Sequence, residues 1–182
     1  MIDQNTSNIT KTKDSNQKNI LIDMYCGTGS IGITVADLFD HVIGIDEVAV
    51  SIENAKLNVK INNLNNFSFI TGKCENSLEE INRLCNLSVN VNDDNVNIYL
   101  VVDPSREGLH KRVRKFIKNI SCSGFVYCSC NVNSWMSDIK DIMGFDTNNQ
   151  SYIPSCIPLQ TLIVNLFPHT QHYEVLSCFK NK

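Results

Sequence analysis

Three short segments, far apart in the sequence, carry side chains that together can act on a substrate. Asp103 and Arg106 lie in the first, Cys130 in the second and Glu174 in the third. A thiol is a natural nucleophile because part of it is thiolate near neutral pH. A carboxylate can accept a proton, and a guanidinium can offset developing negative charge. These residue types predict covalent catalysis, with Cys130 as nucleophile and Glu174 as base.

Each of these residues, taken alone, also has an ordinary structural interpretation. Asp103 is followed by Pro104 and later by Gly108, which is common turn chemistry. A single Cys is more often a small buried hydrophobic residue, and a single Glu is usually a solvated surface acid. The prediction of catalysis therefore depends on the segments occurring together and in this order.

A glycine-rich turn near the start of the chain predicts a nucleotide-type cofactor. The apolar run Ile20 to Met24 leads into Gly27, Gly29 and Gly32, which fit the pattern G-x-G-x-x-G. Glycine lets the backbone turn tightly and approach a ligand closely, and Asp46 after the next apolar run is placed to bind ribose hydroxyls. The pattern alone favours NAD and S-adenosylmethionine about equally. A tight turn without a ligand also fits it.

Apolar runs alternate with segments of helical spacing along the chain. Strands are expected at residues 20–24, 42–45, 67–71, 98–102, 125–128, 161–166 and 173–179, and helices near 31–38, 52–59, 77–85, 109–120 and 135–142. This order predicts an α/β fold with a mostly parallel seven-stranded sheet, closed by a C-terminal antiparallel hairpin. Ligands bind beyond the carboxyl ends of parallel strands, so Asp103 and Cys130 should face the site.

Composition sets the broad class of the protein. The chain has 182 residues, 42% of them hydrophobic, which suits one domain over residues 20–182. Residues 1–19 are almost entirely polar and are expected to form a disordered tail, and polar loops are expected near 86–97 and 146–152. No apolar run is long enough for a membrane helix. Residues 1–19 contain no apolar signal region, so we expect the eight cysteines to be reduced thiols in an intracellular protein, cytoplasmic or nuclear. None of them forms a CxxC pair, so no metal site is expected.

The ordered segments resemble the RNA uracil-C5 methyltransferase family, whose members form 5-methyluridine, and especially its eukaryotic tRNA enzymes. The resemblance covers about residues 21–178. The family's loop Asp-x-Tyr/Cys-Cys-Gly-x-Gly is matched by residues 23–29. Its Asp-Pro-Pro-Arg-x-Gly is matched by residues 103–108, with Ser105 in place of the second proline.

The two remaining family motifs are also present, each with one departure. Ser-Cys-Asn-Pro is matched by residues 129–132, with Val132 in place of proline. Phe-Pro-Gln-Thr-x-His-x-Glu is matched by residues 167–174, with His169 in place of glutamine. Asp46 stands where the family usually has glutamate. The departures leave every catalytic side chain in place.

The resemblance implies a class I, Rossmann-like methyltransferase domain that transfers a methyl group from S-adenosylmethionine to C5 of a uridine in RNA, with tRNA as the expected substrate. It implies that Cys130 is the nucleophile and Glu174 the base, that Asp103 holds the cofactor or the target base, and that Arg106 orients the loop or offsets charge. The implied cofactor contacts are Asp23, Tyr25, Gly27, Gly29, Ser30, Asp46 and Asp103.

The charge of the chain bears on RNA binding. The formal net charge of −3 is unusual for a dedicated nucleic-acid-binding domain. Family members carry an N-terminal region that helps bind RNA, so we expect this chain to be an isolated catalytic domain. One basic cluster can meet phosphates or form a solvated face: Lys111, Arg112, Arg114, Lys115 and Lys118. Nothing in the sequence predicts an oligomeric state.

Two other functions are consistent with parts of the sequence. An NAD-dependent oxidoreductase accounts for the glycine turn but leaves Cys130 and Glu174 unexplained. An RNA-binding module that keeps the fold without turnover also remains open.

Overall fold

The computed structural model describes residues 17–88, 96–144, 156–166, 168–170 and 172–181. A single seven-stranded sheet runs through them in the order β3-β2-β1-β4-β5-β7-β6. Its strands are β1 (Lys18–Met24), β2 (His41–Asp46), β3 (Phe67–Thr71), β4 (Val96–Val102), β5 (Gly124–Ser129), β6 (Cys156–Val164) and β7 (Glu174–Asn181). The helices are α1 (Ser30–Thr34), α2 (Ala49–Ile61), α3 (Leu78–Ser88), α4 (Lys111–Asn119) and α5 (Val132–Met143), with 3₁₀ turns η2 (Ala36–Leu38) and η3 (Cys74–Asn76).

The pairing of the strands confirms the predicted mostly parallel sheet with a C-terminal hairpin. β1 pairs in parallel with both β2 and β4, β2 with β3, and β4 with β5. β7 is antiparallel to β5 and to β6. The strand order reverses between β1 and β4, and at such a switch point the carboxyl ends of the strands open into a crevice.

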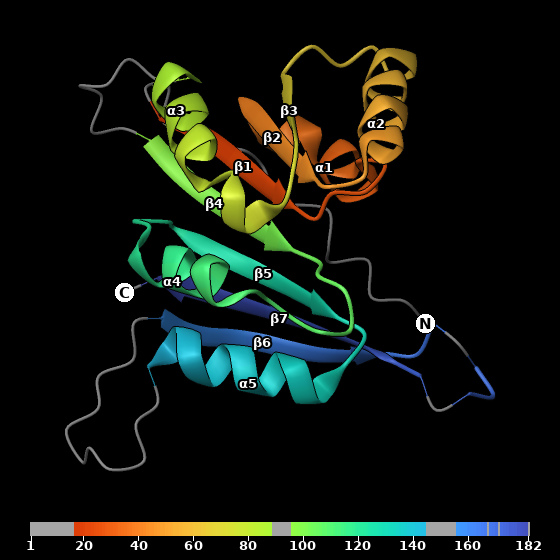
Figure 1. Cartoon of the computed structure of the whole chain (residues 1–182), viewed down its shortest axis with the longest axis vertical. Helices are drawn as coiled ribbons and strands as arrows, with labels where there is room; N and C mark the ends of the chain where they lie inside the picture. The colour runs from red at the N-terminus through yellow and green to blue at the C-terminus, as the bar shows by residue number, and fades with distance from the viewer. Residues whose placement is uncertain (1–16, 89–95, 145–155, 167, 171, 182) are drawn as a thin grey trace, which may run out of the picture.

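The two faces of the sheet are covered unequally. α3, α4 and α5 lie in front of the sheet in Figure 1, and they contribute Ile81, Val113 and Ile139 to the larger hydrophobic core. On the other face, the fully buried cluster is small and centres on Leu21 and Val101. An apolar hollow of about 710 Å³ lies on that face, lined by side chains of β4, β5, β6 and β7 together with α1 and η2.

Several element boundaries differ from those expected. β6 begins at Cys156 and runs through Pro158, because β6 is an edge strand and a missing N–H is tolerated there. α1 ends at Thr34 because Val35 leaves the helical conformation, and the expected helix of 31–38 continues only as η2. β1 begins at Lys18, within the segment expected to be a tail.

Some expectations lie outside the described residues. These are most of the tail, the greater part of the 86–97 loop, the 146–152 connection and Phe167. Within the ranges given above, no helix is long and apolar enough to cross a membrane.

Candidate functional site

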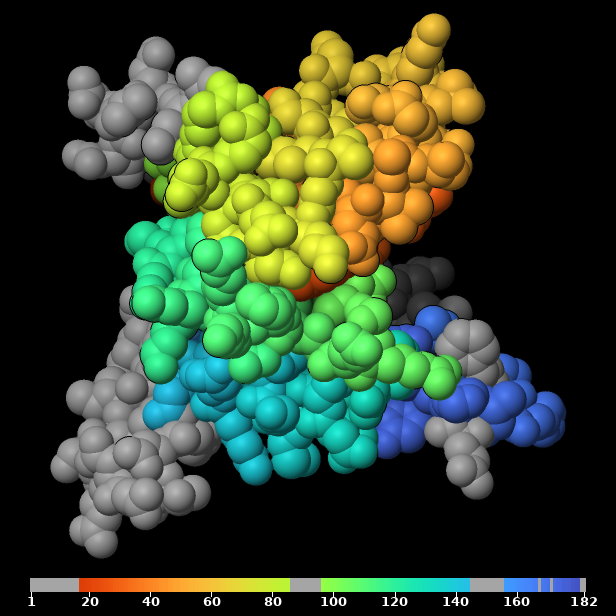
Figure 2. All heavy atoms as spheres, viewed as in Figure 1, coloured from red at the N-terminus to blue at the C-terminus, as the bar shows by residue number. Residues whose placement is uncertain are grey.

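A cavity of about 460 Å³ opens at the carboxyl ends of β1 to β4. Three of the predicted cofactor residues, Tyr25, Asp46 and Asp103, line it. The other lining residues are Glu47, Val48, Lys73, Cys74, Glu75, Ser105, Glu107, Gly108, Leu109 and His110. In Figure 2 the yellow atoms of the segment after β3 lie against the green atoms of α4 and the loop before it, at this edge of the molecule.

The Asp46 carboxylate lies beside the glycine-rich turn and accepts main-chain hydrogen bonds that hold it. One carboxylate oxygen, Oδ2, accepts a hydrogen bond of 2.9 Å from the main-chain N–H of Gly27, and Oδ1 accepts one of 2.8 Å from Val48. Gly27 and Gly29 have φ angles of 53° and 81°, which glycine adopts without strain. Asp46 therefore shapes both the turn and the entry to α2, while its side chain also faces the cavity.

Asp23 lies beneath the turn and does not line the cavity. Its side chain is 1% exposed, and its Oδ2 accepts a hydrogen bond of 3.0 Å from the N–H of Gly32. A Cβ at Gly32 would lie 2.9 Å from this oxygen, so the main chain can come this close to Asp23 only with glycine at position 32. Burial, reinforced by the charges of Asp103 and Asp46, raises the pKa of Asp23 to about 7.

Four of the predicted cofactor residues do not line the cavity. Gly27 and Gly29 belong to the turn that borders it, Asp23 lies in β1 beneath the turn, and Ser30 begins α1. The turn itself is well formed, since Gly29 donates to the carbonyl of Cys26 at 2.8 Å and its own carbonyl accepts from Ile33 at 2.9 Å. These residues shape one wall, and Tyr25 presents a side chain to the cavity from the same turn.

Asp103 connects the cavity with the residues predicted to do chemistry. It follows β4 directly, and its N–H bonds to the carbonyl of Met24 at 3.3 Å. Partial burial raises the pKa of the Asp103 carboxyl, and the nearby charge of Glu174 raises it further. Asp103 and Glu174 therefore lie close enough to repel each other electrostatically.

Cys130 and Glu174 lie at the same edge of the sheet. β5 ends at Ser129, which is paired with Val175 of β7. Cys130 directly follows Ser129 and Glu174 directly precedes Val175, so the two residues are neighbours at this edge, and both are half-buried. Neither lines the 460 Å³ cavity, so the predicted nucleophile and base lie beside the cavity, on the far side of Asp103.

Cys128 is the other thiol that could act as a nucleophile on β5. Burial, followed by the charges of Asp103, Asp23 and Glu174, raises the pKa of the Cys128 thiol to about 12. A thiol with such a pKa carries almost no thiolate at neutral pH and reacts slowly. Cys128 also lines the apolar hollow of the opposite face.

Arg106 contributes its main chain to the site. The residue is exposed, and its carbonyl accepts a hydrogen bond of 2.9 Å from the side-chain Nδ2 of Asn131. The loop that carries it turns at Gly108, whose N–H bonds to the carbonyl of Ser105 at 2.9 Å. The exposed side chain of Arg106 is therefore carried by a loop whose main chain is fixed by hydrogen bonds.

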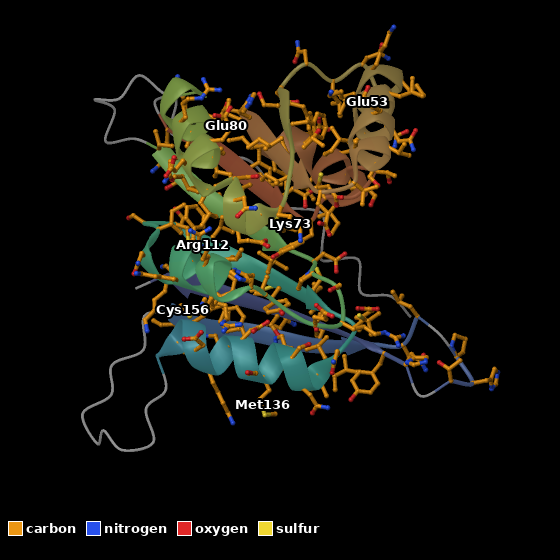
Figure 3. All side chains as sticks on the ribbon, viewed as in Figure 1. Glu53, Lys73, Glu80, Arg112, Met136 and Cys156 are labelled. Carbon is orange, nitrogen blue, oxygen red and sulfur yellow. The ribbon has the colours of Figure 1, made fainter. Side chains whose placement is uncertain are left out.

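The lining residues that were not predicted as cofactor contacts come in equal parts from the segments after β2 and β3 and from the loop after β4. Glu47 and Glu75 bring the number of carboxylates in the lining to five, with Asp46, Asp103 and Glu107. Lys73, labelled in Figure 3, lies 3.9 Å from Glu47. The rule that carboxyl ends of strands face the site, applied to β3, would have found Glu75. Among the described residues, no group of His, Cys, Asp and Glu is placed to hold a metal ion.

The basic helix α4 offers fewer free cations than its sequence indicates. The Arg114 guanidinium binds Asp138 at 2.9 Å and Asp141 at 2.5 Å. Arg112, labelled in Figure 3, approaches Asn76 with an N–O distance of 3.4 Å. The exposed lysines of the helix are Lys111, Lys115 and Lys118.

The strand order, the antiparallel last strands and the cavity at the carboxyl edge together define a class I, Rossmann-like methyltransferase fold. Solved structures under 25% identical share this fold, among them an rRNA methylase from Streptococcus thermophilus, 11% identical, with a TM-score of 0.58 over 91% of this chain and 88% of that one. The model of the family tRNA (Uracil-5-)-methyltransferase matches residues 5–176. The chain therefore belongs to this family.

Individual relatives agree with the family. The chain is 30% identical to human tRNA (uracil-5-)-methyltransferase homolog A and 32% identical to homolog B of Danio rerio, over 88% of its own length in each case. It spans only 24% and 32% of those two proteins. The crystal structure of Pyrococcus abyssi tRNA (uracil-54, C5)-methyltransferase in complex with S-adenosyl-L-homocysteine matches 90% of this chain and 34% of that one, with 28% identity and a TM-score of 0.65.

Proposed function

We propose that this chain is a catalytic domain that transfers a methyl group from S-adenosylmethionine to C5 of a uridine in RNA, with tRNA as the substrate. The observation that carries the proposal is the grouping of Asp103, Cys130 and Glu174 at one edge of the sheet, beside a cavity. Family membership and the S-adenosyl-L-homocysteine complex of the Pyrococcus abyssi relative support the same reaction.

The cavity suits S-adenosylmethionine in size and charge. Its 460 Å³ falls within the range of small-molecule sites, and the carboxylates of Asp46, Glu47 and Glu75 can accept hydrogen bonds from hydroxyl groups or face a cation. S-adenosylmethionine supplies an electrophilic methyl group on a positively charged sulfur. We assign the ribose to Asp46, because its carboxylate lies at the end of β2, where acids of this fold class bind ribose hydroxyls.

The reaction needs help because C5 of uracil is a weak nucleophile. The Cys130 thiolate adds to C6, forming an S–C6 bond and moving an electron pair through C5 and C4 onto O4 as an enolate. That enolate makes C5 nucleophilic, and C5 takes the methyl group as the bond between the methyl carbon and the sulfonium sulfur breaks, which leaves S-adenosylhomocysteine. Glu174 then accepts the C5 proton, the C5–C6 double bond forms again, and the Cys130 thiolate leaves.

The remaining residues hold the reactants. A base in RNA must leave its stack to reach such a pocket, and it then needs contacts on its polar edge. Asp103 lies between the cavity and Glu174, which suits it to hold the base or the methyl donor. We assign to Arg106 the role of offsetting the negative charge of the enolate, because a guanidinium stabilises a developing oxyanion.

A comparison of two cysteine variants tests the proposal. Cys130→Ala should abolish transfer of a labelled methyl group to uridine C5, whereas Cys128→Ala should leave it near the wild-type rate, since burial keeps the Cys128 thiol protonated. Titration with S-adenosylhomocysteine and with NAD separates this function from that of an oxidoreductase. A Cys130→Ala variant that still methylated C5 would refute the mechanism.

A further inference from the structure

Asn131 lies directly after Cys130, and its side chain joins two loops of the proposed site. Its Nδ2 donates a hydrogen bond of 2.9 Å to the main-chain carbonyl of Arg106, 25 residues earlier in the chain. Its Oδ1 accepts one of 3.0 Å from the N–H of Asn133 and caps the first turn of α5. The two ends of one amide group thus make a local contact and a contact between loops.

The main chain around Cys130 is held by its two neighbours. The Ser129 hydroxyl donates to the carbonyl of Asn131 at 3.0 Å and accepts from its N–H at 3.2 Å. Ser129 is only 2% exposed, so this clasp is shielded from water. Because Cys130 lies between the two clasped residues, its position follows that of Asn131.

A second contact from α5 holds the same loop of residues 103–110. Asp138, which is 3% exposed, accepts hydrogen bonds from the N–H of Leu109 and from the Tyr127 hydroxyl, both at 2.7 Å. Gly108 has a φ of 80°, and a Cβ there would lie 2.5 Å from Asp138 Oδ2. The loop is therefore bound to α5 at the Arg106 carbonyl and again at the Leu109 N–H.

These contacts connect the predicted nucleophile to the wall of the cofactor cavity. Asp103, Ser105 and Glu107 of the loop line the cavity, and Cys130 precedes α5 by two residues. We propose that Asn131 is a positioning residue, which fixes the Cys130 thiol relative to the cofactor-binding loop through its bond to the Arg106 carbonyl. This inference rests on the proposed methyl transfer, in which thiol, target base and methyl donor must be aligned.

The two contacts of Asn131 can be separated by substitution. Asn131→Ser and Asn131→Asp keep a side-chain oxygen that caps helices as well as asparagine does, but both lack the Nδ2 donor. Asn131→Ala loses both contacts. Asn133→Ser, an exposed change in the first turn of α5, is the matched control.

Single-turnover methyl transfer to a tRNA T-arm RNA, at saturating S-adenosylmethionine, is the first measurement. Asn131→Ser and Asn131→Asp should lower the rate about 10- to 100-fold, because small misplacements of a reacting group cost about that much. Their melting temperatures should equal that of the wild type. Asn131→Ala should melt about 2–4 °C lower, since it also loses the cap. Asn133→Ser should match the wild type in both.

The alkylation rate of Cys130 by iodoacetamide, followed by peptide mass spectrometry, is the second measurement and needs no RNA. S-adenosylhomocysteine should change this rate severalfold in the wild type, because it contacts the loop bound to Asn131. In Asn131→Ser that response should disappear while S-adenosylhomocysteine still binds. The alkylation response therefore tests whether Asn131 positions Cys130 even if the wild-type chain methylates no uridine.

Three results would overturn the proposal. The first is a wild-type transfer rate and a wild-type alkylation response in both Asn131→Ser and Asn131→Asp. The second is failure of these cap-retaining variants to fold, which would assign Asn131 a purely structural role. The third is an equal loss of transfer in Asn133→Ser.

Discussion

Cys130 and Glu174 flank the last residue pair of β5 and β7, in which Ser129 is paired with Val175. Residues at the ends of two paired antiparallel strands are close in space, because such strands lie about 4.7–4.9 Å apart. Asp103 is close enough to Glu174 for the Glu174 charge to raise its pKa. A thiol and a carboxylate so placed can contact neighbouring atoms of one ring, as addition at C6 and proton removal at C5 require.

Replacing the base should stop the reaction after methyl transfer. Glu174→Gln keeps the size of the side chain but cannot accept the C5 proton, so turnover should fall about 10²- to 10⁴-fold and a covalent complex with ordinary RNA should accumulate. Denaturing electrophoresis of the labelled RNA detects that complex. Glu53→Gln, on the exposed side of α2, serves as control (Figure 3). Normal turnover by Glu174→Gln would exclude Glu174 as the base.

Cofactor affinity should depend on Asp46. Asp46→Ala removes a carboxylate that lines the cavity and holds the N–H groups of Gly27 and Val48. We expect S-adenosylmethionine binding to weaken by roughly 1.5–3 kcal/mol, the contribution of a hydrogen bond to a charged group. Isothermal titration calorimetry measures this loss. An unchanged dissociation constant would mean that the ribose lies elsewhere.

The stability of the fold should fall as pH rises through the range set by Asp23. Its pKa is raised from 3.8 to about 7, so between these values the folded chain holds a proton that the unfolded chain has lost. This stabilisation is complete below about pH 4 and is lost by about pH 7, at up to about 1.4 kcal/mol per pH unit.

Asp23→Asn provides the control for that pH dependence. Asparagine can still accept the hydrogen bond from Gly32 but carries no ionisable group, so this part of the slope should vanish. Urea unfolding of the wild type and of Asp23→Asn at pH 5 and pH 7.5 measures how much the free energy of unfolding changes with pH in each protein. Identical slopes in the two proteins would show that the Asp23 carboxyl is ionised in the folded state.

Residues 1–182 by themselves should bind S-adenosylmethionine but methylate tRNA poorly. Specific RNA binding normally uses a sizeable positively charged interface. The chain has a net charge of −3, and in α4 the guanidinium of Arg114 is engaged by Asp138 and Asp141. Fusing an N-terminal RNA-binding region from a longer relative should raise turnover. Efficient, site-selective methylation by these residues without it would show that they suffice for RNA recognition.

The architecture could be predicted from the sequence because apolar runs alternate with helical spacing and each predicted site segment follows or begins a strand. The hairpin pairing of β6 with β7 was predicted in the same way. The start of β6 was misjudged because Pro158 is permitted only by its edge position, which depends on the strand order.

The parts of the site that sequence reasoning missed depend on contacts between distant segments. The burial of Asp23 under the turn follows from the packing of α1 against β1, and the bond from Asn131 to the Arg106 carbonyl joins residues 25 positions apart. An amide that bonds to a main-chain carbonyl leaves no pattern of residue types, because any residue supplies the carbonyl. Asp138 is similar, since its partner is the N–H of Leu109.

The central claim is that Cys130 forms a bond to C6 of the target uridine, and a mechanism-based trap tests it most directly. The chain is incubated with S-adenosylmethionine and a tRNA T-arm that contains 5-fluorouridine. Its C5 carries fluorine in place of hydrogen, so no C5 proton can be removed after methyl transfer and the bond to the enzyme remains. Even slow turnover should accumulate an adduct, and mass spectrometry should locate it on Cys130 in the wild type and in Cys128→Ala. No adduct in the wild type, or an adduct that persists in Cys130→Ala, would contradict the account.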